Sequence, residues 1–181
     1  MEPDMKKNEK SCRKINLGCG KKTREGYLNL DFIKAEGVDV VHDLNRFPWP
    51  FPDSTFDEIY ASHLLEHLSD LRKAMEEIRR ICKNKAKVII RAPHFSCGVT
   101  FRDPTHQHFF SYFTFDYFTK MEYGLPKFKI IRRRLNFTRE AFPFLNKFVN
   151  PALNLSPAIY ERFFCWIFPC AEVLFTLEVE K

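Results

Sequence analysis

The segment Ile15-Asn16-Leu17-Gly18-Cys19-Gly20 decides the fold class, because a short apolar run here enters a Gly-x-Gly turn. Residues 14–17 have the pattern of a buried strand. The two glycines let the backbone bend sharply and let a ligand approach closely, since neither carries a Cβ. A strand followed by such a turn is typical of nucleotide-binding α/β proteins, although a Gly-x-Gly pair alone also occurs in ordinary tight turns.

Acidic residues follow the next two apolar runs of the chain. Asp31 ends the run 27–30, and Asp43 comes just after the run 38–41. The carboxyl ends of parallel strands share one edge of a sheet, and ligands of open α/β sheets bind at that edge. Asp31 is placed to accept hydrogen bonds from ribose hydroxyls, and Asp43 suits the edge of an adenine. The sequence therefore predicts a site for an adenosine-like group beside the glycine turn.

The rest of the chain continues the alternation of strands and helices. The pattern predicts further strands over 56–61, 87–92, 128–137 and 172–180, and helices over 70–82 and 113–123. The first helix has apolar residues at steps of three and four, and Ser69 or Asp70 can cap it. We therefore expect an α/β protein, a Rossmann-like three-layer sandwich with a mostly parallel sheet. The expected organisation is one domain over 1–181, with a mobile leader at 1–11 and a helical insertion at 138–170.

Four stretches in order resemble one known family. They are LGCG at 17–20, GYLNLD at 26–31, DVVHDLNRFPWPFPDSTFDEIYASHLLEHL at 39–68 and EEIRRICKNKAKVIIRAP at 76–93. Together they resemble the class I S-adenosylmethionine-dependent methyltransferases, and most closely the small type-11-like members, over residues 14–93. The resemblance implies a seven-stranded sheet whose last strand is antiparallel, which suits the alternating run 172–180.

The resemblance also implies S-adenosylmethionine as cofactor, with a binding site on the glycine turn and the strand ends. The implied residues are Gly18, Cys19 and Gly20 along the methionine part, Asp31 at the ribose, Asp43 and Leu44 beside the adenine, and Ser62 and His63 near the sulfonium. His63 is the candidate catalytic residue, because an imidazole with an ordinary pKa near 6.5 suits base catalysis at neutral pH.

The first crossover departs from the family's pattern. Only residues 21–30 separate Gly20 from Asp31, and the family usually places a full helix there. We expect a turn or two of helix at most. The short spacing also disfavours a dinucleotide site, in which the acidic residue lies ~20 residues further on.

Histidines outside the glycine turn suggest further chemistry. His63, Glu66 and His67 match H-x-x-E-H, the inverted zincin pattern, so a zinc hydrolase is an alternative interpretation. That motif lacks a third ligand, and we predict no metal site. In the loop after the fifth strand, His94, Arg102 and His106 are expected to bind the methyl acceptor. The same loop, with Asp103 and His108, is an alternative set of metal ligands.

Charge and aromatic content bear on partners. The net charge is +6, and the basic segment 127–134 could bind nucleic acid, so an RNA-binding or RNA-modifying protein of the same fold is an alternative. The same segment can also be a strand edge protected by arginines. The aromatic segment 141–170 could close over a hydrophobic acceptor, pair two subunits in a homodimer, or belong to a non-catalytic interaction module.

Other features concern location and acceptor. No run approaches the ~20 apolar residues of a membrane span, and the first residues are polar. The six cysteines form no C-x-x-C pair, which indicates neither a zinc ribbon nor a redox motif. Because no secretory signal is seen, we expect free thiols in a cytoplasmic protein. The expected acceptor is a small or hydrophobic molecule whose identity the sequence does not give.

Overall fold

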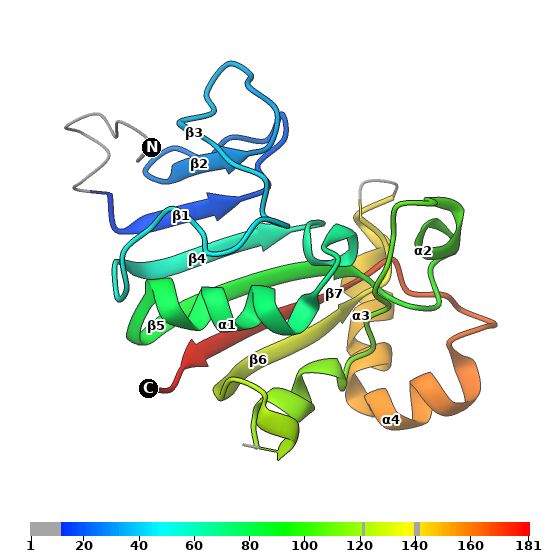
Figure 1. The fold of residues 1–181 in the computed structure, drawn as a ribbon. Helices are drawn as coiled ribbons and strands as arrows, with labels where there is room; N and C mark the ends of the chain where they lie inside the picture. Colours follow the sequence, from blue (N-terminus) through cyan, green and yellow to red (C-terminus); the bar gives the residue numbers. More distant parts are fainter. Residues whose placement is uncertain (1–11, 121, 140–141) are drawn as a thin grey trace.

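A seven-stranded sheet forms the centre of the computed structural model, which describes residues 12–120, 122–139 and 142–181 (Figure 1). The expected leader 1–11 lies outside the described residues. The strands are β1 (Lys14–Leu17), β2 (Leu28–Asp31), β3 (Val40–Val41), β4 (Phe56–Ser62), β5 (Cys82–Pro93), β6 (Phe128–Asn136) and β7 (Glu172–Val179). Their spatial order is β3-β2-β1-β4-β5-β7-β6.

The strand directions confirm the predicted sheet. The pairs from β3 to β5 are parallel, whereas β7 is antiparallel to both β5 and β6. The chain runs outward from β1 to β2 and β3, and then returns to β4 on the other side of β1. This reversal makes the carboxyl ends of β1 and β4 the switch point where α/β sheets bind ligands.

Helix α1 (Leu71–Ile81) forms as predicted, because Asp70 accepts a hydrogen bond from the Lys73 amide at its N-cap. The prediction of a helix over 113–123 is wrong. That stretch holds the 3₁₀ turns η3 (Thr114–Phe118) and η4 (Glu122–Gly124), and Tyr123 has a φ of +58°, which an α-helix excludes. The loop 94–112 contains a short helix, α2 (Gly98–Arg102).

One further 3₁₀ turn, η2 (Leu65–His67), precedes α1, and the other helical elements lie in the segment expected to be a helical insertion. They are α3 (Leu145–Leu155), α4 (Pro157–Ile159) and the π-helical turn η5 (Tyr160–Phe164). Within the described chain, no helix is both long and apolar enough to cross a membrane.

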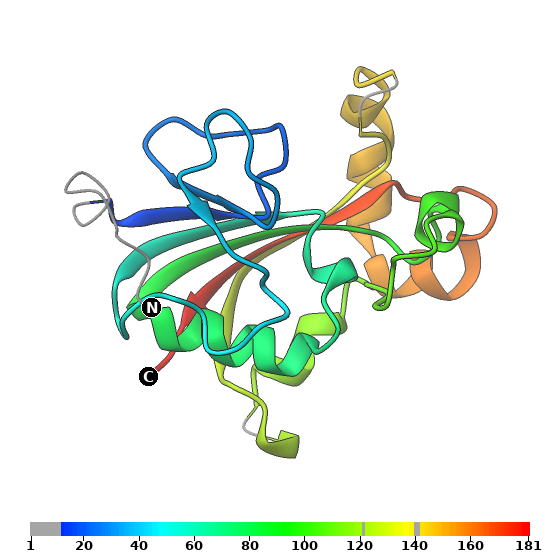
Figure 2. The ribbon, with the colours of Figure 1, turned by 45° about the horizontal axis from the view of Figure 1, so that its top comes forward.

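The two faces of the sheet differ in chemistry. Side chains alternate along each strand, and directly paired residues share a face. Ile15, Ile59 and Val88 share one face of the sheet and are fully buried there. The turn η3 packs on this face, because its Phe115 contacts Phe175, the partner of Ile90. Helix α1 lies on the same side of the sheet as η3 (Figure 2). Most of the strand neighbours of Ile15, Ile59 and Val88, on the opposite face, are polar, with Asn16 paired to Tyr60, while Ile89 is an apolar exception. We call this second surface the polar face.

The layer over the polar face is built differently from the layer over the apolar face. Between β1 and β2, and between β2 and β3, the chain forms loops without a helix, in line with the short first crossover. These loops and α3 lie on the side of the sheet opposite α1 (Figure 2). The predicted three-layer fold is confirmed, with loops in place of the first crossover helices.

Helix α3 protects the free edge of the sheet at β6. Asn146, Asn150 and Asn154 follow one another at steps of four and so share one side of the helix. Asn154 accepts from the Leu135 amide and donates to the Leu135 carbonyl, and Asn146 makes the same pair of bonds to Thr138. The amide side chains thus take the place of a neighbouring strand.

Candidate functional site

A cavity of about 690 Å³ opens at the carboxyl ends of β1 and β2. Its walls come from the glycine turn, from the ends of β2 and β3, from the segment around the 3₁₀ turn η2 (Leu65–His67), and from Thr105. The predicted residues among its lining are Gly18, Gly20, Asp31, Asp43, Leu44 and His63. We call this hollow the main cavity. The fold therefore gathers the strand-end residues in one place.

The glycine turn has the conformation that its sequence requires. Gly18 and Gly20 have φ values of +62° and +52°, in the left-handed region that favours glycine. A Cβ on Gly18 would lie 2.7 Å from Cδ1 of Leu64, whereas a Cβ on Gly20 would meet no atom within 4 Å. Gly18 therefore allows the turn to pack on Leu64, and Gly20 leaves the cavity side of the turn open.

We expect Gly18→Ala to destabilise the protein by roughly 1–3 kcal/mol, because alanine there meets both an unfavourable φ and the Leu64 side chain. Gly20→Ala is the matched control, since it changes only the backbone preference. Urea unfolding of both variants would measure the difference. Equal losses in the two variants would contradict the packing role of Gly18.

Asp31 holds the glycine turn and the loop after β2 together. Its Oδ2 accepts from the Gly20 amide at 2.8 Å, and its Oδ1 accepts from the Ile33 amide at 3.1 Å. The residue is 8% exposed and lines the main cavity. A carboxylate has about four acceptor positions, so these two bonds leave acceptor capacity for a ligand.

The end of β3 forms the next part of the wall. Asp43 Oδ1 accepts from the Asn45 amide, and Asn45 Oδ1 accepts from the amide and hydroxyl of Ser69. Leu44 is 5% exposed, and its carbonyl accepts from the indole of Trp49. These bonds fix a carboxylate and an apolar side chain beside each other at the cavity wall.

Cys19 and Ser62 face a different hollow from the other predicted cofactor residues. They line a second cavity of about 390 Å³ on the polar face, together with Arg24, Tyr60 and Arg91. Ser62 follows Tyr60 by two positions and so points to the same face. Burial raises the pKa of the Cys19 thiol to about 11, which keeps it neutral. All six cysteines are free.

His63 lies between two buried carboxylates. Its Nδ1 is 3.3 Å from Oε1 of Glu66, and its Nε2 is 3.4 Å from Oε2 of Glu172. Burial alone would lower the pKa of His63, but the contacts with Glu172 and Glu66 outweigh it and raise the pKa. His63 has a φ of +53°, which turns its side chain away from the alternation of β4 and toward the cavity.

Glu172 is the centre of a charged network that the sequence did not predict. Arg91 binds its two oxygens at 2.6 and 3.1 Å, and Asn136 donates at 2.9 Å. Burial would raise the pKa of this carboxyl, but the contacts with His63, Arg91 and Asn136 lower it to about 2. One signal was available, because Arg91 is a charge within the apolar run 87–92 and a buried charge needs a partner.

The lowered pKa of Glu172 gives a prediction for pH dependence. The folded pKa of about 2 lies below the ordinary value of 4.5, so the carboxylate contributes stability that is present above pH 4.5. That stability is lost as the pH falls from 4.5 toward 2. We expect the difference in unfolding free energy between wild type and Glu172→Gln to shrink over this range. Urea titrations at several pH values would measure it, and a difference that does not change with pH would contradict the assignment.

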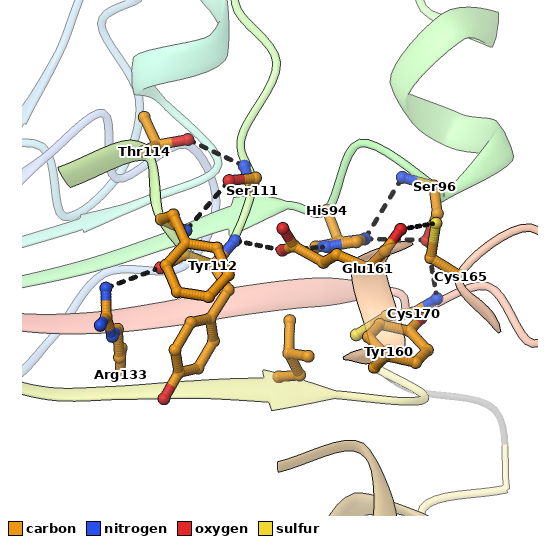
Figure 3. A network of polar contacts seen from close by, with 12 residues as sticks. His94, Ser96, Ser111, Tyr112, Thr114, Arg133, Tyr160, Glu161, Cys165 and Cys170 are labelled. Atoms are coloured by element: carbon orange, nitrogen blue, oxygen red, sulfur yellow. Dashed lines mark hydrogen bonds and ion pairs between the residues drawn. The ribbon is translucent and has the colours of Figure 1, made fainter. Parts of the chain in front are cut away.

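His94, a predicted acceptor-binding residue, is enclosed in a network of its own (Figure 3). It is fully buried, its Nδ1 is 2.8 Å from the Ser96 hydroxyl, and its Nε2 is 3.1 Å from Glu161. Glu161 also accepts from the Tyr112 amide, and Ser96 accepts from the Cys170 amide. The ring therefore ties the loop after β5 to the segment before β7 and does not face the main cavity.

The two other predicted acceptor residues differ from each other. Arg102 ends α2 and is exposed, away from the lining of the main cavity. His106 packs edge-on against His67, with ring centroids 4.7 Å apart, and His67 lines the cavity. His106 is thus in contact with the wall of the main cavity, whereas Arg102 does not line this cavity.

The inverted zincin interpretation is wrong. That motif needs its two histidines on one face of a helix. Here η2 covers only Leu65–His67, and His63 precedes it with a left-handed backbone. His63 and His67 therefore do not share a helix face.

The basic and aromatic segments form surface features. Segment 127–134 lies in and just before the edge strand β6, where Arg132 and Arg134 are exposed and Arg133 stacks on Tyr112. In segment 141–170 many large apolar side chains are exposed: Phe142, Phe144, Phe148, Phe163, Trp166 and Phe168. A nucleic-acid partner and a homodimer through these surfaces stay predictions.

Comparison with known proteins agrees with this geometry. Residues 20–90 match a family model described as a methyltransferase domain. A 41-residue part of the chain is 54% identical to an uncharacterised protein of Methanocaldococcus jannaschii, MJ0638, and this match covers 23% of the chain and 18% of that protein.

Solved structures share the fold over nearly the whole chain. A SAM-dependent methyltransferase from Archaeoglobus fulgidus has a TM-score of 0.56 and 18% identity, covering 94% of this chain and 87% of that one. A geranyl diphosphate methyltransferase in complex with SAM has a TM-score of 0.58 and 13% identity, covering 92% and 77%. At these identities the likeness concerns the fold, and it confirms the predicted seven-stranded architecture.

Proposed function

We propose, from the methyltransferase-domain sequence of residues 20–90 on a class I methyltransferase fold, that the main cavity binds S-adenosylmethionine and that the chain transfers its methyl group. The observation that carries the proposal is the meeting of the glycine turn with Asp31 and Asp43 in one hollow. This proposal assigns Gly18 and Gly20 to the methionine part, Asp31 to the ribose, and Asp43 with Leu44 to the adenine.

The residues present fit such a cofactor. The cavity volume of about 690 Å³ lies within the range of roughly 300–1,000 Å³ typical of ligand pockets. The side of the turn at Gly20 is free of side chains, and Asp31 retains acceptor capacity after its two backbone bonds. Cys19 and Ser62 line the second cavity instead, so the proposal gives them no direct role in holding the adenosyl group.

The cofactor, when bound, supplies a methyl group on a sulfonium sulfur, which is the difficult part of the chemistry. The chain's own residues then have to hold and orient the two reactants. His63 is proposed as the group nearest the reaction, because it lines the cavity and is fixed by Glu66 and Glu172. Its raised pKa makes it a stronger base when it is neutral and a cation over a wider pH range.

The acceptor is proposed to be a small or hydrophobic molecule. The main cavity wall carries both polar and apolar side chains at His63, Leu64 and Leu68. The loop after β5 also carries an apolar hollow of about 510 Å³, lined in part by Phe95, Phe109 and Phe113. These features support an acceptor with an apolar body.

Isothermal titration with S-adenosylmethionine and S-adenosylhomocysteine tests the cofactor assignment. We expect saturable binding of both, with one site per chain. Release of S-adenosylhomocysteine in the presence of candidate acceptors then tests the reaction. Absence of heat at millimolar ligand would contradict the proposal, and NAD binding in the same cavity would favour a different cofactor.

A further inference from the structure

Glu66 is a buried carboxylate without adequate partners. It is fully buried, and neither of its side-chain oxygens has a hydrogen-bond partner among the described residues. Nδ1 of His63 approaches Oε1 to 3.3 Å, which is an ion pair when that ring is protonated. Oε2 still lacks a donor. A buried charge in this state is costly unless a cation or donor compensates it.

Two histidines near Glu66, His67 and His106, are each held in orientation by a hydrogen bond at Nδ1. His106 Nδ1 is 3.0 Å from the Thr100 carbonyl, which can only accept, so Nδ1 carries the proton. His67 Nδ1 is 2.8 Å from the Thr105 hydroxyl, and that hydroxyl donates to Asp103. The Thr105 oxygen therefore accepts from His67. In the neutral rings Nε2 then carries the lone pair, and Nε2 of His106 lies 3.8 Å from Oδ2 of Asp103.

This arrangement is the one that metal-binding histidines require. A ligating imidazole usually donates its other N–H to a carbonyl or to a group bonded to a carboxylate, which fixes the ring and its tautomer. Thr100 plays that part for His106, and Thr105 with Asp103 plays it for His67.

The three side chains converge. One donor atom each from Glu66, His67 and His106 lies within 4.8 Å of the others. Three ligand atoms about 2 Å from one ion lie roughly 3.5 Å apart, so the cluster would have to close by about 1 Å. The His67 and His106 rings already touch, with centroids 4.7 Å apart.

We propose that Glu66, His67 and His106 form a binding site for a divalent transition metal, with Zn²⁺ as the preferred ion. Two imidazoles and one carboxylate are a ligand set that zinc accepts, with a fourth position left for water or another oxygen or nitrogen ligand. His67 and Thr105 line the main cavity, so the ion lies at its wall. The site does not depend on the proposed methyl transfer.

Metal content of the untagged, full-length protein tests the proposal. The protein is stripped with EDTA, equilibrated with Zn²⁺, desalted and measured by mass spectrometry. We expect one zinc per wild-type chain, and at least about a hundredfold weaker binding in His67→Ala and His106→Ala. Co²⁺ in place of zinc should give the visible spectrum of a four-coordinate complex.

Further variants separate a metal site from a structural role of the histidines. Thr105→Ala leaves all three ligands in place but removes the partner of His67, and it should weaken zinc binding by about 10–100-fold. His42→Ala removes another histidine of the same cavity and should leave zinc binding unchanged. Zinc should raise the melting temperature of wild type and of His42→Ala, but not that of His67→Ala.

A wild-type protein that retains no zinc would overturn the proposal, as would His67→Ala and His106→Ala binding zinc like wild type. Titration of the zinc-free protein with S-adenosylhomocysteine is made in parallel. Because cofactor binding is measured without the metal, failure of one assignment is distinguishable from failure of the other.

Discussion

Replacement of Glu172 by alanine is expected to lower the free energy of unfolding by about 3–5 kcal/mol, because one partner of a buried charge network is removed. Arg91 would lose both of its bonds to the carboxylate, and His63 and Asn136 would each lose one contact. For a chain of this length, each kcal/mol corresponds to roughly 2–4 °C in melting temperature. We expect a decrease of about 10 °C.

Glu178→Ala is the matched control for this change. Glu178 lies on β7 like Glu172, six residues later, and it is only half-buried. A surface carboxylate of this kind should contribute less than about 0.5 kcal/mol. Thermal and urea unfolding at pH 7 would compare the two variants. Equal losses from Glu172→Ala and Glu178→Ala would show that the network contributes no net stability.

The strands and the main cavity could be predicted from sequence because both follow from local patterns. Apolar runs such as 14–17 form strands wherever they can be buried, and parallel strands bring their carboxyl ends to one edge. Gly18, Asp31 and Asp43 needed no knowledge of tertiary contacts, since each ends such a run or follows it within two residues. The main cavity is thus encoded locally.

The features that the sequence did not predict depend on contacts between distant parts of the chain. His94 is buried because Glu161, 67 residues later, bonds to its ring. His63 is held by Glu172, 109 residues later. Ser62 and His63 are adjacent, yet they face different cavities because His63 has a left-handed backbone. No short-range pattern gives these pairings.

The short first crossover has a structural consequence that reaches the site. Without a helix between β1 and β2, the polar face beside the glycine turn is left with polar side chains in place of an apolar layer. The Asn16 side chain donates a hydrogen bond to Asn29. The Arg24 guanidinium stacks on Tyr60, with Cζ 3.9 Å from the ring centroid. Because no helix N-terminus supports the glycine turn, its position rests on hydrogen bonds from Cys19 to Leu30 and from Gly20 to Asp31.

Asp31→Ala is therefore expected to reduce affinity for S-adenosylhomocysteine by at least about a hundredfold. Each hydrogen bond to a charged group contributes about 1.5–3 kcal/mol, and two ribose hydroxyls would lose such a bond. A loss of ~2.8 kcal/mol corresponds to a hundredfold change in Kd. The glycine turn would also lose the bond between the Gly20 amide and Oδ2. Isothermal titration would measure the change.

Two control variants separate the ligand contact from the loop contact. Asp31→Asn keeps one acceptor oxygen without the charge, so its affinity should fall between those of wild type and Asp31→Ala. Asp53→Ala removes an exposed carboxylate that pairs with Arg80, and its affinity should match wild type. If Asp31→Ala remains folded by circular dichroism and binds the ligand as tightly as Asp53→Ala does, Asp31 does not hold the ribose, because the loss of its side chain then has no effect on binding.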